Sequence, residues 1–217
     1  AHPAETADAF EELGVDELKP YVDLLRAHPE SDALRAVLTA VLTADRDAIA
    51  DTVDRTARAA RARAADGGGR FAARHDAVLR MERHFPGDPG VIAGLLLNPV
   101  RLQPGEALFL SAGVPHAYLD GLGVEIMATS DNVLRCGLTP KHVDVPELLR
   151  IVRFEPTEPG VLPPVAQGGE EAYLAPVDDF RLSRLRLRPG SAPRELGGLA
   201  PQILLCTSGR ALLRTAD

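Results

Sequence analysis

The sequence predicts a mainly β protein that begins with a helical domain. Over residues 1–85, apolar side chains repeat at the spacing of amphipathic helices. After Asn98, proline and glycine become frequent and the apolar runs shorten, as expected of strands joined by turns. Residues 124–129 alternate Val124, Ile126 and Ala128 with polar or larger neighbours, which is the period of a strand. The change of periodicity near Asn98 separates the two regions.

Several stop and start signals divide the helical region. One apolar stripe is especially regular, and it consists of Leu34, Val37, Leu38, Val41 and Leu42. Ser31 and Asp32 are candidate caps for that helix, and Asp45 or Asp47 can open the next one. The triple glycine 67–69 is expected to end it. Residues 91–97 fit a short helix or a strand equally well.

The remaining sequence is expected to form antiparallel strands. Candidate strands cover residues 100–103, 107–110, 124–129, 180–183 and 185–187, and residues 203–213 resemble a hairpin. The expected organisation is a helical domain over residues 1–97, barrel strands over 98–155, a proline-rich linker or long loop over 156–176, and the first strands of another barrel over 177–217.

Composition excludes several classes of protein. The 217 residues carry a formal net charge of −7 and no tryptophan, which disfavours general nucleic-acid binding and binding to membrane surfaces. Cys136 and Cys206 are too few and too far apart for a disulfide framework or a thiolate zinc finger. No apolar run approaches the ~18 residues of a membrane span, and no signal peptide is visible. We therefore expect a cytoplasmic protein.

The clearest chemical candidates begin at residue 115. Pro115 fixes the backbone before His116, and Tyr118 shares a strand face with that histidine. A neutral imidazole is the commonest metal ligand. A surface histidine or a hydrogen-bonded core histidine is an equally good interpretation of His116.

A second group of candidates lies between residues 125 and 141. Glu125 either faces solvent or points into a barrel, where it would need a cation as partner. Arg135 lies in an apolar run, where an unpaired guanidinium is costly. It either pairs with Glu125 or Asp131 or awaits an anion. Lys141 adds a second cation, and the two together suit a phosphorylated substrate.

Three stretches together resemble type I mannose-6-phosphate isomerases. They are the segments Pro104–Leu110, Pro115–Leu119 and Glu125–Lys141, and the run from Ser130 to Lys141 is the most specific. The match is dense over residues 86–155. The helical region is similar by position and pattern. The resemblance implies two cupin-type antiparallel β-barrels (a bicupin) with a helical domain, the C-terminal barrel being incomplete here.

The resemblance also implies a function and a set of site residues. The function is a zinc-dependent interconversion of mannose 6-phosphate and fructose 6-phosphate through an enediol, with zinc as Lewis acid. His116 matches a zinc ligand, and Glu125 and Arg135 match active-site residues. Tyr118 and Lys141 match positions that line the same cleft. Arg135 would stabilise developing negative charge, and Glu125 would move a proton or orient a hydroxyl.

The family's other zinc ligands, a Gln-x-His pair and a glutamate, belong before the helical domain, and no glutamine precedes Gln103. We therefore expect an incomplete chain whose parent holds one zinc, binds a sugar phosphate and is a monomer. Two alternatives stay open at this point. One is a non-catalytic sugar-phosphate binding protein or degenerate paralogue, and the other is a metal-independent β-barrel binding module.

Overall fold

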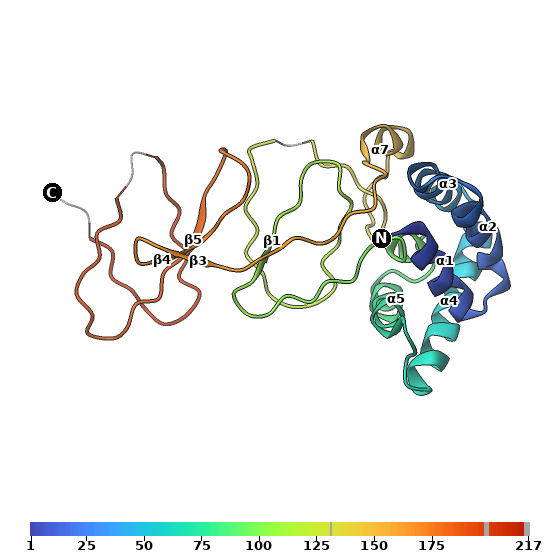
Figure 1. Ribbon diagram of the computed structural model, residues 1–217, viewed down its shortest axis with the longest axis horizontal. Coiled ribbons are helices and arrows are strands. Elements are labelled where there is room, and N and C mark those ends of the chain that lie inside the picture. Colours follow the sequence, from blue (N-terminus) through green and yellow to red (C-terminus); the bar gives the residue numbers. More distant parts are fainter. Residues whose placement is uncertain (131, 198–199, 215–217) are drawn as a thin grey trace. The chain divides into compact units, whose positions relative to one another are not determined.

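The computed structural model describes residues 1–130, 132–197 and 200–214. It divides into two units, residues 1–184 and 185–217. The first unit begins with six α-helices and one 3-10 helix (Figure 1). Their bounds are α1 Pro3–Leu13, η1 Asp16–Leu18, α2 Lys19–Ala27, α3 Glu30–Leu42, α4 Arg46–Ala65, α5 Ala72–His84 and α6 Gly90–Gly94.

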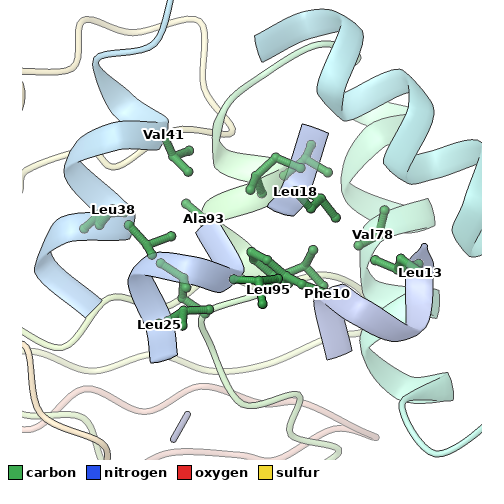
Figure 2. Packing of buried hydrophobic residues seen from close by; sticks show 14 of the residues in the cluster. Phe10, Leu13, Leu18, Leu25, Leu38, Val41, Val78, Ala93 and Leu95 are labelled. Carbon is green, nitrogen blue, oxygen red and sulfur yellow. The ribbon is translucent and has the colours of Figure 1, made fainter. Parts of the chain in front are cut away.

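The helices enclose one apolar core, which Figure 2 shows in close-up. Phe10 of α1, Val37 of α3, Val53 of α4 and Ile92 of α6 are all at most 1% exposed. Removing such side chains from water is the main favourable term in folding. The stripe predicted on α3 is confirmed: Val37, Leu38 and Val41 face this core.

The predicted helix boundaries are partly confirmed. Asp45 caps α4, since its side chain accepts hydrogen bonds from the backbone N–H groups of Asp47 and Ala48. Gly67–Gly69 follows the end of α4 at Ala65. The expected cap of α3 is wrong, because Pro29 precedes the first helical residue Glu30 and no side chain caps it. Residues 90–94 resolve as helix.

One helix was missed in the sequence. Helix α7, Val145–Ile151, lies within the stretch expected to be strands. Asp144 caps it by accepting a hydrogen bond from the Glu147 N–H, and Pro146 occupies its first turn. This start signal is visible in the sequence. The helix packs against α3, where Arg35 donates to the Leu149 carbonyl oxygen at 2.8 Å.

The strands of the first unit form two small antiparallel sheets. In one, β1 (Ala107–Leu108) pairs with β2 (Val161–Leu162). In the other, β4 (Glu170–Tyr173) lies between β3 (Val165–Gln167) and β5 (Leu182–Arg184). Tyr173 ties the second sheet to the turn at residues 103–106, because its hydroxyl donates to the Gly105 carbonyl oxygen at 2.8 Å.

Residues 156–176, which were expected to form a linker or long loop, contain three of these strands. Gly168 and Gly169 both have positive φ and connect β3 to β4, as in a two-residue hairpin turn. Conversely, the stretches 100–103, 124–129, 185–187 and 203–213 carry no strand in the described residues. A strand needs a hydrogen-bonded neighbour, and no closed barrel forms in the described part of the chain. The domain boundaries stay predictions.

Two buried polar side chains lie at the start of α5. Arg74 is 4% exposed and donates to the Leu95 carbonyl oxygen at 2.9 Å. His75 is 1% exposed, and its Nε2 lies 3.9 Å from Oε1 of Glu12. Burial lowers the pKa of His75 and outweighs the opposite influence of the Glu12 carboxylate.

None of the described helices is both long enough and apolar enough to cross a membrane.

His75 should make stability depend on pH. Because its pKa is lowered in the folded state, the unfolded chain takes up the proton first as pH falls below about 6.5. We therefore expect the free energy of unfolding to fall from pH 7 towards about pH 5.5, and His75→Gln to make that fall smaller. Urea titrations at several pH values measure it. His84→Gln on the exposed face of the same helix is the control, and an equal slope in His75→Gln and wild type would contradict the prediction.

Candidate functional site

Three of the predicted site residues lie together on the loop that follows β1. The rings of His116 and Tyr118 meet edge to face, with centroids 5.9 Å apart. The Tyr118 hydroxyl donates to Oε1 of Glu125 at 2.9 Å. Tyr118 thus connects His116 to Glu125. Some desolvation by neighbouring atoms and the hydrogen bond to this carboxylate both raise the pKa of Tyr118, so its hydroxyl stays protonated and acts as a donor.

His116 has one ring nitrogen placed by the backbone. Its Nδ1 lies 3.1 Å from the Val114 carbonyl oxygen, two residues earlier in the chain. With the proton on Nδ1, this hydrogen bond orients the ring and leaves the Nε2 lone pair for a ligand. The side chain is exposed, so the buried core interpretation of His116 is wrong.

Helix α5 holds the same loop at a second point. Arg80 donates to Asp120 at 2.8 Å and to Asp76, one turn back on its own helix, also at 2.8 Å. Asp120 lies between Tyr118 and Glu125 in the sequence. Both partners are exposed, so the ion pair fixes orientation more than it adds stability.

Arg135 and Lys141 are not bonded to this group. Within the described residues, no ion pair or hydrogen bond joins either cation to His116, Tyr118 or Glu125. Arg135 is exposed, so the expected desolvation cost of its guanidinium does not arise. Glu125 is bonded to Tyr118, and no pairing of Glu125 with Arg135 is observed. The other expected partner, Asp131, lies outside the described residues.

The segment that carries both cations packs on the turn between α5 and α6. One oxygen of Asp88 accepts hydrogen bonds from the backbone N–H groups of Gly90, at 2.7 Å, and Leu138, at 2.9 Å. Gly137 has a φ of +143° and Leu138 a φ of +52°. A Cβ on Gly137 would lie 2.7 Å from the Gly90 Cα.

Cys136 lies beside this contact. Burial, and secondly the Asp88 carboxylate, raise the pKa of its thiol to about 11. A thiol with such a pKa is protonated at neutral pH and a poor nucleophile. Cys136 therefore has a packing role and is not a catalytic candidate.

The described residues do not by themselves fit a zinc ion. Nowhere in the described ranges do three or more His, Cys, Asp or Glu side chains converge as a metal site would require. Catalytic zinc sites use about three protein ligands, and the sequence-predicted set supplies His116 alone.

Comparisons with known proteins confirm the resemblance seen in the sequence. The chain is 49% identical over 138 residues to mannose-6-phosphate isomerase of Salmonella typhimurium, covering 62% of this chain and 34% of that protein. It is 47% identical over 138 residues to the enzyme of the same name from Escherichia coli, covering 63% and 35%. The chain thus spans about a third of the length of these curated relatives. No family model matches the sequence.

The structure is similar to that of a solved mannose 6-phosphate isomerase bound with zinc and yttrium. The TM-score is 0.60 at 36% sequence identity, and the similarity covers 80% of this chain and 45% of the other. The expected fold class is therefore confirmed in part, because the chain shares its fold with this protein over the matched region. The two-barrel detail stays a prediction.

Substituting Gly137 should destabilise the contact between the two segments. Gly137→Ala would place a methyl group against the Gly90 backbone and force a positive φ on a residue with a Cβ. We expect a loss of about 1–3 kcal/mol in the free energy of unfolding. Gly123→Ala is the matched control, since a Cβ there would meet nothing within 4 Å. Equal stabilities of the two variants in chemical denaturation would contradict this account.

Proposed function

We propose that this chain is part of a mannose-6-phosphate isomerase, which interconverts mannose 6-phosphate and fructose 6-phosphate. The 49% identity over 138 residues to a protein of that name is the observation that carries the proposal. The hydrogen bond from Tyr118 to Glu125 beside His116 supports it, because the resemblance places these three residues in one cleft. We propose that the complete protein contains cupin barrels, one of which includes residues 98–155.

The reaction moves a proton between C1 and C2 of the sugar through an enediol. A carboxylate in hydrogen-bond reach can carry such a proton or orient a sugar hydroxyl, and we assign this role to Glu125. Tyr118 holds the Glu125 carboxylate by its hydroxyl. This hydrogen bond orients the Glu125 carboxylate relative to the ring of Tyr118.

The two cations are assigned to the charges of the substrate. Arg135 and Lys141 are exposed, and neither forms an ion pair in the described part of the chain. A guanidinium binds oxyanions through two N–H groups, whereas an ammonium acts as a point charge. We assign Arg135 to the oxygen that becomes negative in the enediol and Lys141 to binding of the phosphorylated substrate.

Zinc enters the proposal only for the complete protein. We propose that His116 is one of its ligands and that the others lie outside these 217 residues, with one zinc per complete chain. The cytoplasmic location and the monomeric state expected from the sequence stay predictions.

A second candidate is a sugar-phosphate binding protein without catalysis, for which the two exposed cations Arg135 and Lys141 would suffice. It would bind mannose 6-phosphate through Arg135 and Lys141 and would not turn it over. Measuring binding and turnover on the same preparation of the complete protein separates the two candidates.

His116→Ala should lower the zinc content of the complete protein. Loss of one of about four ligands weakens the site, so we expect occupancy to fall below about half. Elemental analysis after dialysis measures this. His142→Ala, another exposed histidine, should leave the zinc content unchanged. The 217-residue chain alone should be largely zinc-free and inactive, and stoichiometric zinc in it would refute this assignment.

Arg135→Lys should lower kcat and kcat/KM together. If Arg135 stabilises the developing charge, we expect a loss of about 2–4 kcal/mol in transition-state stabilisation. The melting temperature should change little, because the side chain is exposed. Steady-state kinetics and thermal melts of the complete protein measure both, with the exposed Arg101→Lys as control. A normal kcat would remove Arg135 from the catalytic residues.

A further inference from the structure

A single carboxylate oxygen joins the helical region to the segment that carries the two cations. Oδ1 of Asp88 accepts from the N–H of Gly90, two residues on, and from the N–H of Leu138, fifty residues on. The first bond shapes the turn from which α6 begins. The second bond holds the backbone at Leu138, fifty residues away in the sequence, on that turn.

The geometry leaves little room for another arrangement of this backbone. Gly90 and Gly137 touch backbone to backbone, and a Cβ on Gly90 would lie 2.8 Å from the Leu138 nitrogen. Leu138 has a φ of +52°, which is rare for a residue with a side chain and needs its surroundings to hold it. Cys136 and Leu138 both pack against the helical core, and Arg135 is exposed.

The place of this contact in the sequence matters for the site. Leu138 lies three residues after Arg135 and three residues before Lys141. Neither of these cations has an ion-pair partner in the described ranges that could orient its side chain. The backbone between them therefore determines the positions from which the two charged side chains extend.

We propose that Asp88 is a positioning residue of the isomerase site. It holds the backbone at Leu138 so that the side chains of Arg135 and Lys141 are correctly placed for the negatively charged groups of the substrate. This inference rests on the proposed function. Asp88 touches neither the substrate nor the reacting atoms in this account, and it acts through the segment 135–141.

A purely structural role would have a different signature. It would lower stability and leave the kinetics of folded molecules unchanged. Asp45 provides a matched control, because its Oδ1 also accepts two backbone N–H groups, those of Asp47 and Ala48, at the start of α4. Asp45→Ala removes an equivalent carboxylate cap without touching the segment 135–141.

The experiment compares Asp88→Ala, Asp88→Asn and Asp45→Ala in the complete protein. Asparagine keeps an oxygen acceptor and loses the charge, so the comparison of Asp88→Asn with Asp88→Ala isolates the hydrogen bonds. A pulse of iodoacetamide, followed by mass spectrometry of the Cys136 peptide, reports local opening of the contact. Steady-state kinetics with mannose 6-phosphate report kcat and KM.

We expect Cys136 to be labelled at least about tenfold faster in Asp88→Ala than in Asp88→Asn. We expect kcat/KM to fall about 10²-fold in Asp88→Ala, as for a misplaced catalytic group, and to stay within about threefold of wild type in Asp88→Asn and Asp45→Ala. If Asp88→Ala does not fold, Asp88→Glu replaces it, because the extra methylene moves the carboxylate away from its own backbone and out of the position from which Oδ1 accepts both N–H groups.

Two results would overturn the inference while the proposed function stands. One is an active wild type in which Cys136 is labelled equally fast in Asp88→Ala and Asp88→Asn. The other is faster labelling in Asp88→Ala with unchanged kinetics. An inactive wild type would instead refute the proposed function and the positioning role with it, and the labelling would still show whether Asp88 holds Leu138.

Discussion

Where the chain passes the turn between α5 and α6, Gly137 lies so close to Gly90 that a Cβ on either residue would meet backbone at less than 3 Å. Glycine is required here for space, and at Gly137 also for its φ of +143°. The Asp88 carboxylate completes the contact from the side. Together with the packing of α7 on α3, this contact links the β region of the first unit to its helical core.

Stability and candidate chemistry lie in different parts of this unit. The helices bury nearly all of the large apolar side chains in the core, whereas His116, Tyr118, Glu125, Arg135 and Lys141 are all exposed on segments with little regular structure. Functional residues on loops held by a rigid scaffold are a common arrangement. The scaffold contacts are specific: Arg80 holds Asp120, and Asp88 holds Leu138.

Local signals made the helices predictable, and non-local pairing made the strands difficult to predict. The stripe on α3 and the Asp45 cap follow from residues three or four apart. By contrast, β1 pairs with residues 161–162, and nothing within β1 specifies that partner. The hairpin at Gly168-Gly169 and the Asp144 cap of α7 carry recognisable local signals, although neither element was predicted.

In the candidate site, too, some features could be predicted from the sequence and others depend on contacts between distant residues. The sequence identifies His116, Tyr118 and Glu125, and the structure joins them through one ring contact and one hydrogen bond. The burial expected for Arg135 is wrong, because its apolar neighbours in sequence do not surround it in space. The importance of Asp88 depends on a partner fifty residues away and could not be seen in the sequence.

The most direct test of the account is NMR of mannose 6-phosphate incubated with the folded, zinc-loaded complete protein. We predict the appearance of fructose 6-phosphate until equilibrium is reached, and unchanged mannose 6-phosphate would contradict the account.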